Sequence, residues 1–387
     1  MMMAFFLFIL LFFLTLAMLY LYVIAFASFL PRTEPKERTN PKYHFAVIVP
    51  AHNEEKFISN TLTNLKSISY PSELYQIIVI ADNCSDDTAK EAISCGVRCL
   101  ERSEPTKRGK GQALRYAFDI LLPEDFQAII VVDADTVVDY DFLNVINNHL
   151  QQGAKVVQTR YGINNPDDNP LSYLFAVGNT IENDLLLRGR ENLGLPSMLR
   201  GNGMGFLSQV LRDNPWEASS VVEDTEYSLE LLRRRVRTYL LPETEVRASM
   251  PCNFEQATAQ RIRWASGNSR LAKLESVALI AEGIKGKRID LVEVGWLMLI
   301  RSKPLLLILS LTLLALCVFS GTFIAWSLFL FLLLIFYIFL GMIVMGLSFY
   351  RFKLALTAPF SLCWLIMISL LGIIGFRSNL WTRTRRS

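Results

Sequence analysis

The chain has 387 residues, of which 52% are hydrophobic, and a formal net charge of +3 at neutral pH. A charge this small, with no segment in which basic and aromatic residues interleave, argues against nucleic-acid binding. Three histidines and six cysteines without paired spacing argue against a zinc site and fit a reducing, cytosol-facing domain.

Apolar residues are concentrated in three stretches, over residues 4–30, 304–349 and 354–376. A membrane-spanning helix needs about 20 apolar residues, so these stretches predict one, two and one spans. The first is too long for a cleavable signal peptide and lacks its basic flank, which predicts an uncleaved anchor. We therefore expect an anchor over 1–31, a soluble domain over 32–270, interfacial amphipathic helices over 271–303, and about three spans with a basic tail over 304–387.

The basic residues around the spans predict an orientation. Under the positive-inside rule, the cluster after the anchor places the soluble domain in the cytoplasm of a multi-pass protein of the inner or plasma membrane; this cluster is Arg32, Lys36, Arg38 and Lys42. The basic tail does not fit four spans, because four would place it outside; its arginines are Arg377, Arg383, Arg385 and Arg386. A re-entrant apolar segment is one way to resolve this conflict.

The soluble domain alternates short β-branched runs with amphipathic stretches, which predicts an α/β fold with a mostly parallel, Rossmann-like sheet covered by helices. Strands are expected at 45–49, 76–81, 128–132 and 155–159, and helices at 54–65, 85–94, 109–121 and 140–151. Ligands of such sheets bind beyond the carboxyl ends of the strands. Asn53 with Glu54, Asp82, and Asp133 with Asp135 follow three of these strands and should line one crevice.

The rest of the domain is predicted from its patterns. Residues 171–190 read as helical, and 200–205 form a glycine-rich turn that contains Gly201 and Gly203. A helix begins near Glu223. Residues 271–300 alternate apolar and charged residues at helical spacing, which is typical of helices that lie in a membrane interface.

Three groups of acidic residues are candidates for chemistry, each with a plainer alternative. Asp133 and Asp135 flank a small residue, so both should face one side, where a divalent cation would relieve their repulsion; a solvated turn is the alternative. Asp82 suits a hydrogen bond to a nucleotide base, although its neighbours could simply cap the next helix. Asp224 could take a proton from an acceptor hydroxyl. Alternatively, it could be an acidic residue that the helix dipole stabilises in the first turn.

Two further segments could bind phosphate or sugar. Lys110 lies in a basic, glycine-containing turn before a helix, which suits a diphosphate, or is a solvated loop. In Gln260-Arg261-Ile262-Arg263-Trp264, an arginine fork can clamp phosphate and a tryptophan can stack on a sugar. Alone, these residues could equally belong to an ordinary amphipathic helix.

Taken in order, these residues resemble the family-2 glycosyltransferases, most of all the membrane-bound branch that includes cellulose, chitin, hyaluronan and poly-N-acetylglucosamine synthases and ceramide glucosyltransferase. The resemblance covers about residues 45–264 and extends to the flanking spans. The series that carries it is Pro50-Ala51-His52-Asn53-Glu54, Asp82, Asp133-Ala134-Asp135, Glu223-Asp224 and Gln260-Arg261-Ile262-Arg263-Trp264.

The resemblance implies a GT-A fold, a UDP-linked sugar donor, a Mg or Mn ion and inversion at the anomeric carbon. By this resemblance Asp82 would bind the nucleotide base and Asp133 the ribose or sugar of the donor. Asp135 would bind the metal, and Asp224 would be the catalytic base. Gln260, Arg263 and Trp264 would close over the diphosphate and the acceptor. Val222 and Asn202 depart from the pattern of many synthases, which leaves processivity and acceptor open.

Three functions compete. The first is extension of a β-linked polysaccharide by an inverting, metal-dependent hexosyltransferase, and the second is transfer of one or a few sugars to a membrane lipid. A transporter with a nucleotide-binding domain predicts charged residues within the spans, and few are present. The sequence names neither the sugar nor a partner subunit.

Overall fold

The structure is a computed structural model that describes residues 1–31, 39–250, 254–356 and 358–375. It divides into two compact units, each built from separate chain segments. We refer to them as the sheet unit, within 31–165 and 194–250, and the helical unit, within 1–30, 166–193 and 251–379. Arg32, Lys36 and Arg38, Cys252 and the arginines of the basic tail lie outside the described residues.

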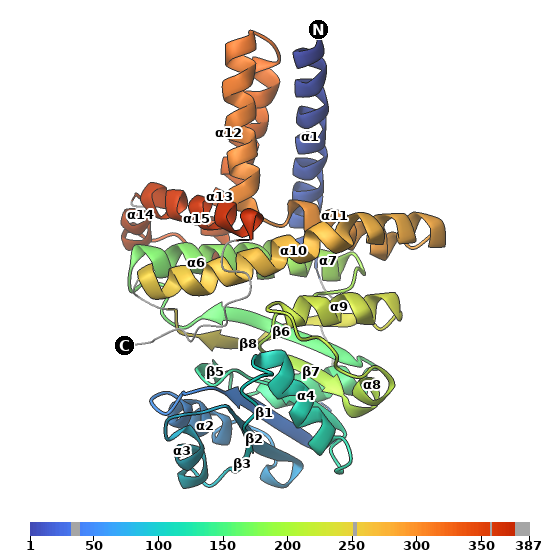
Figure 1. Cartoon of the computed structure of the whole chain (residues 1–387), viewed down its shortest axis with the longest axis vertical. Helices are drawn as coiled ribbons and strands as arrows, with labels where there is room; N and C mark the ends of the chain where they lie inside the picture. Colours follow the sequence, from blue (N-terminus) through green and yellow to red (C-terminus); the bar gives the residue numbers. More distant parts are fainter. Residues whose placement is uncertain (32–38, 251–253, 357, 376–387) are drawn as a thin grey trace. The chain divides into compact units, whose positions relative to one another are not determined.

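The sheet unit contains an eight-stranded mixed sheet in the order β3-β2-β1-β4-β7-β6-β8-β5 (Figure 1). Its strands are β1 (Phe45–Ala51), β2 (Tyr75–Asp82), β3 (Arg98–Arg102), β4 (Ala128–Val131), β5 (Thr136–Val138), β6 (Val156–Ile163), β7 (Met204–Leu207) and β8 (Thr238–Ala248). Strands β3, β2, β1 and β4 are parallel, whereas β7 runs antiparallel to both β4 and β6.

Helices cover both faces of this sheet, as the α/β pattern predicts. Buried residues of α2 (Ile58–Lys66) and α5 (Phe142–Gln151) form one core with the strands. Buried residues of α4 (Lys110–Leu121), α8 (Ser208–Asp213) and α9 (Glu223–Arg233) form the core on the other face. The unbroken apolar runs of β1 and β4 are fully buried, which is what two covered faces require.

The predicted strands and helices are present, with shifts of a few residues at their ends. The helix expected at 54–65 begins at Ile58, and the helix expected at 85–94 is α3 (Thr88–Ser94). Four strands were not expected from the sequence, namely β3, β5, β7 and β8. β3 and β8 carry many charged residues and β5 is short, so their hydrophobic alternation is weak.

The helical unit consists of 166–193 together with both ends of the chain. Helix α6 (Pro170–Thr180) continues through a π-helical segment, η2 (Ile181–Leu187), into α7 (Arg188–Asn192). Helices α10 (Phe254–Gly286) and α11 (Ile289–Ile300) follow. The domain boundary expected at 270/271 falls inside α10, and residues 166–193 belong to this unit rather than to the sheet unit.

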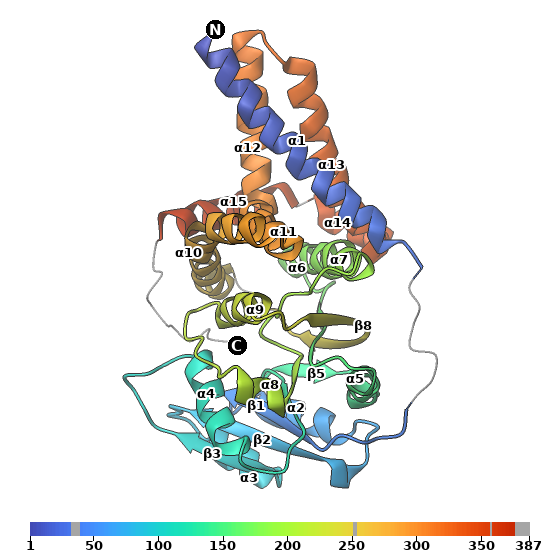
Figure 2. The ribbon, with the colours of Figure 1, turned by 90° about the vertical axis from the view of Figure 1, so that its right-hand side faces the viewer.

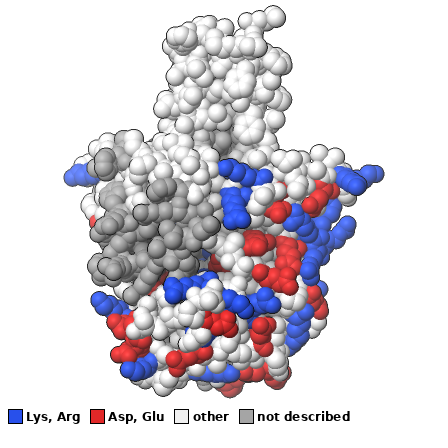
Figure 3. Space-filling model, viewed as in Figure 1, with Lys and Arg blue, Asp and Glu red and all other residues white. Residues whose placement is uncertain are grey.

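Three helices are long and apolar enough to cross a membrane: α1 (Met2–Ser28), α12 (Lys303–Ser320) and α13 (Ile324–Met345). They lie side by side (Figure 2). Figure 3 is viewed as Figure 1, and the column at its top, which these three helices form, shows no Lys, Arg, Asp or Glu on the visible face. A fourth candidate, α14 (Phe349–Leu356) with α15 (Ala358–Ile374), is bent by 56° and is therefore a broken span or a re-entrant loop.

Candidate active site

Asn202 connects the glycine-rich turn to the carboxyl end of β4. Its buried side chain accepts a hydrogen bond from the backbone N–H of Asp133 at 3.1 Å and donates one to Thr136 Oγ1 at 2.8 Å. The backbone N–H of Thr136 in turn donates to Asp133 O at 3.2 Å. The amide side chain between the two glycines therefore helps to fix the turn that carries Asp133 and Asp135, and Thr61 Oγ1 also donates to Ala134 O at 2.8 Å.

The glycines on either side of Asn202 are favoured by backbone conformation, and Gly203 is also required by space. Gly201 and Gly203 have φ of +78° and +68°, which disfavours residues with a Cβ. A Cβ at Gly203 would lie 2.1 Å from Thr159 Oγ1. A Cβ at Gly201 would lie 3.4 Å from Asp224 Oδ2 and 3.7 Å from Lys110 Nζ.

Lys110, at the start of α4, joins the glycine-rich turn to the acidic turn after β4. Its ammonium forms an ion pair with Asp133 and donates to Gly201 O at 2.6 Å. Burial favours the neutral amine, but the charges of Asp133, Glu223 and Asp224 outweigh it and hold the pKa of Lys110 above its usual value. A cation is therefore held against Asp133, among three carboxyl groups.

Glu223 and Asp224 form the first turn of α9. Asp224 is placed by α9 beside Gly201 and Lys110, and its Oδ1 accepts from the backbone N–H of Thr225 at 2.7 Å. Glu223 is buried, and that burial together with the negative charge of Asp224 raises the pKa of its carboxyl. A protonated Glu223 next to Asp224 reduces the repulsion between the two groups.

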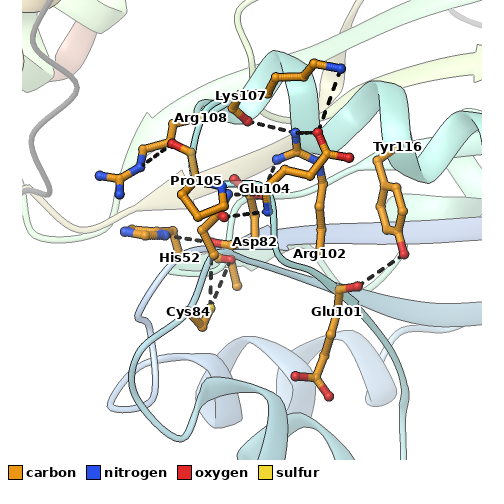
Figure 4. A network of polar contacts seen from close by, with 12 residues as sticks. His52, Asp82, Cys84, Glu101, Arg102, Glu104, Pro105, Lys107, Arg108 and Tyr116 are labelled. Carbon is orange, nitrogen blue, oxygen red and sulfur yellow. Dashed lines mark hydrogen bonds and ion pairs between the residues drawn. The ribbon is translucent and has the colours of Figure 1, made fainter.

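Asp82, at the end of β2, is 4% exposed and pairs with the buried Arg102 of β3, Nη1 to Oδ1, at 2.5 Å (Figure 4). The same Oδ1 accepts from Asn83 Nδ2 at 2.9 Å. Burial raises the pKa of Asp82 despite these partners. The ring of His52 lies against the backbone oxygen of Asp82, 2.6 Å from Nδ1.

Asn53 and Glu54 follow β1 and contact the segment after β2. Asn53 has φ of 58° and its Oδ1 accepts from the backbone N–H of Ser85 at 2.6 Å. The backbone N–H of Glu54 donates to Thr88 Oγ1 at 2.7 Å. These contacts tie the ends of β1 and β2 together, as expected for one edge of a parallel sheet.

The acidic turn fits a hard divalent cation. Asp133 and Asp135 are partly exposed, and the contact of Asp133 with the Lys110 ammonium shows that this carboxylate already attracts positive charge. Among the described residues, no cluster of three or more His, Cys, Asp or Glu side chains could hold a metal. An ion here would complete its shell with diphosphate oxygens and water, which is how Mg²⁺ is commonly held.

The motif 260–264 lies on α10 in the helical unit, not in the sheet unit. There Arg261 stacks between two rings, with its guanidinium 3.8 Å from the ring centroid of Phe175 and 5.3 Å from that of Trp264. Asn268 Nδ2 donates to Trp264 O at 3.0 Å. Gln260 and Arg263 are partly buried.

The structure thus gathers Lys110, Asp133, Gly201 and Asp224 at one point of the sheet unit. Comparison with known proteins identifies the family of the chain. A family model described as glycosyltransferase like family 2 matches residues 41–267, more than half of the chain. The chain belongs to glycosyltransferase family 2.

Two curated relatives illustrate the range of this family. The β-monoglucosyldiacylglycerol synthase of Trichormus variabilis is 28% identical over 249 residues, which are 61% of this chain and 51% of that protein. The poly-β-1,6-N-acetyl-D-glucosamine synthase of Staphylococcus aureus is 25% identical over 231 residues, 57% of this chain and 53% of that protein. The chain therefore spans about half the length of these relatives.

A solved structure shares the fold over nearly the whole chain. The mannosyltransferase PcManGT of Pyrobaculum calidifontis, solved with GDP-Man and Mn²⁺, has a TM-score of 0.58 and 16% identity, and the match covers 97% of this chain and 99% of that one. The fold is GT-A, which confirms the expectation from the sequence.

Two residues that shape this site were missed from the sequence. Arg102 lies on a strand that carries too many charges to be recognised, and it is one of several basic residues that follow Asp82. Asn202 was noted only as a departure from the family pattern. In the structure its side chain bonds both Asp133 and Thr136 at the acidic turn.

Proposed function

We propose that the chain is an inverting, metal-dependent membrane glycosyltransferase that transfers a hexose from a UDP-sugar to a growing β-linked polysaccharide. The observation that carries the proposal is the convergence of Lys110, Asp133, Gly201 and Asp224, because a cation, two carboxylates and an open backbone turn meet there. Displacement of a nucleoside diphosphate requires charge neutralisation on one side of the sugar and a base on the other.

In this proposal Asp224 takes the proton from the acceptor hydroxyl. The acceptor oxygen bonds to the anomeric carbon while the bond from that carbon to the diphosphate oxygen breaks, so the configuration inverts in one step. A Mg or Mn ion, when bound, neutralises charge on the leaving diphosphate. Asp135 would hold this ion, and Asp133 would bind the ribose or sugar of the donor. Lys110 supplies a further positive charge at the same turn, and Glu223 is the first alternative base.

The remaining assignments place the donor and the acceptor. Asp82 binds the nucleotide base, and Asn53 and Glu54 shape the neighbouring strand end. Gly201, beside Asp224, leaves room for the acceptor, whereas Gly203 lets the turn pack against Thr159. Gln260, Arg263 and Trp264 close over the diphosphate and the acceptor sugar. These roles rest on the family resemblance.

The second candidate is glycosylation of a membrane lipid. The relative from Trichormus variabilis supports it, since its name makes it a glucosyldiacylglycerol synthase. The three candidate spans serve either function. Basic residues lie near the ends of the spans, among them Arg301 and Lys303. They favour a protein of the inner or plasma membrane whose sheet unit lies in the cytoplasm.

The test is to incubate membranes that contain the full chain with radiolabelled UDP-sugars and Mg²⁺ or Mn²⁺. Membranes with the Asp224→Asn variant serve as the control. Labelled product that is retained by size supports polysaccharide, whereas product that partitions into organic solvent supports glycolipid. If the protein is folded and none of the UDP-sugars gives a labelled product, the proposal is refuted.

A further inference from the structure

The network around Asp82 restricts which nucleotide base this carboxylate can recognise. Figure 4 shows Arg102 reaching Asp82 from the neighbouring strand. Its other terminal nitrogen, Nη2, donates to Lys107 O at 2.7 Å. Arg102 is 5% exposed, so its charge is buried and held on both sides.

A second residue secures the same oxygen of Asp82. Asn83 donates to Oδ1 through Nδ2, and its own backbone N–H donates to Arg102 O at 2.7 Å. Its Oδ1 accepts from the backbone N–H of Glu104 at 2.8 Å. Asp82 Oδ1 is therefore committed to two protein donors, while Oδ2 makes no hydrogen bond within the part of the chain that the structure describes.

Bases differ in the number of donors they offer to a carboxylate. Guanine presents two adjacent donors, N1–H and the exocyclic amino group, which together pair with both oxygens of one carboxylate. Uracil presents a single N3–H between two carbonyl groups, and one oxygen suffices for it. A carboxylate with one committed oxygen can satisfy uracil fully but leaves a guanine donor unpaired, which is costly in a buried site.

We propose that Arg102 is a specificity-determining residue that occupies one oxygen of Asp82 and so makes this chain select uridine over guanosine donors. The inference rests on the proposed function, in which Asp82 binds the base. It is informative because a solved structure that shares the fold was obtained with GDP-Man. Nucleotide choice is thus set by an ion pair between two side chains of this protein, in addition to direct contacts with the base.

Arg102 also links base selection to the phosphate side of the site. Lys107, whose carbonyl it binds, lies in the basic loop that leads to Gly109 and to Lys110 at the start of α4. A lysine at position 102 would keep the charge but lacks the planar fork needed to hold Asp82 and the Lys107 carbonyl together. Arg102→Lys is therefore the informative substitution.

The experiment measures binding of UDP and of GDP to the full chain in detergent with Mn²⁺ by calorimetry. We expect the wild type to bind UDP on the order of 10- to 100-fold more tightly than GDP. In Arg102→Lys, the affinity for UDP should fall, and the preference for UDP over GDP should shrink about tenfold. Arg98→Lys is the matched control, since Arg98 lies on the same strand and pairs with Glu124 at 2.8 Å; it should keep the preference.

A second variant covers the case in which Arg102→Lys does not fold. Asn83→Gly removes the other donor to Asp82 Oδ1 and tolerates the φ of 51° at this position. It should also reduce the UDP preference, by a smaller factor. The inference would be overturned if the wild type bound GDP as tightly as UDP. It would also be overturned if the folded variants lost affinity for both nucleotides by the same factor. Sugar transfer that proceeds as well from GDP-sugars as from UDP-sugars would refute the inference while leaving the proposed transfer from a UDP-sugar intact.

Discussion

Asn202→Ala should destabilise the sheet unit and disturb the acidic turn in one change. The variant removes the acceptor for the Asp133 N–H and the donor to Thr136 Oγ1, both in a buried setting. Leaving a buried polar group unsatisfied costs about 1–3 kcal/mol, so we expect a total of about 2–4 kcal/mol. At about 2–4 °C per kcal/mol for a domain of this size, the melting temperature should fall by about 4–16 °C.

The assay is thermal unfolding of the full chain in detergent, followed by donor hydrolysis at a temperature where the variant remains folded. Gln209→Ala is the control, because Gln209 is exposed and its one side-chain bond, to Asp213 at 2.7 Å, is also exposed; its melting temperature should shift by less than about 2 °C. An Asn202→Ala protein with unchanged melting temperature and activity would refute the view that this side chain holds the acidic turn.

Further predictions address the metal, the acceptor and the base. Asp135→Ala should abolish transfer while the protein stays folded and membrane-bound, and full activity of the wild type in excess EDTA would contradict a metal requirement. Trp264→Ala should impair transfer to acceptor but largely spare slow hydrolysis of the donor, whereas Arg263→Lys should depress both, because a point charge replaces a bidentate donor; equal loss of both reactions in Trp264→Ala would show that Trp264 shapes the donor site. Because burial raises the pKa of Asp82, the ionised carboxylate that accepts the base N–H should be lost at a higher pH than for an ordinary aspartate of pKa about 3.9. Binding of UDP, measured by calorimetry, should therefore weaken at a pH above the pKa of an ordinary aspartate, and Asp82→Asn should remove this dependence. Equal affinity of the wild type at neutral pH and at the pKa of an ordinary aspartate would disprove it.

The sequence was sufficient for the parts of the fold that follow from local pattern. The buried runs of β1, β2 and β4 and the amphipathic helices between them carry strong periodicity, so the parallel half of the sheet was predicted. β7 and β8 were not, because β7 has only four residues and β8 contains a proline followed by a charged segment. Their pairing with β6 depends on contacts far apart in the sequence.

The candidate site shows the same division. Asp82, Asp133 and Asp224 could be predicted as candidates because each follows a recognisable apolar run or opens a helix. The contacts that hold them were not found, since Arg102 and Asn202 act across 20 and 69 residues respectively. The unit boundary at 166–193 was also missed, because its helices resemble those of a soluble domain until their partners α1 and α13 are known.

The most direct test of the account is the Asp224→Asn variant, studied by single-turnover transfer beside donor binding. The amide keeps the shape of the side chain but cannot accept a proton. We predict that UDP binds within about twofold of the wild type while the rate of transfer falls by roughly 100- to 10,000-fold. Glu223→Gln, the neighbouring control, should retain much of the rate. Near-normal transfer by Asp224→Asn, with loss in Glu223→Gln, would contradict the account and move the catalytic base to Glu223.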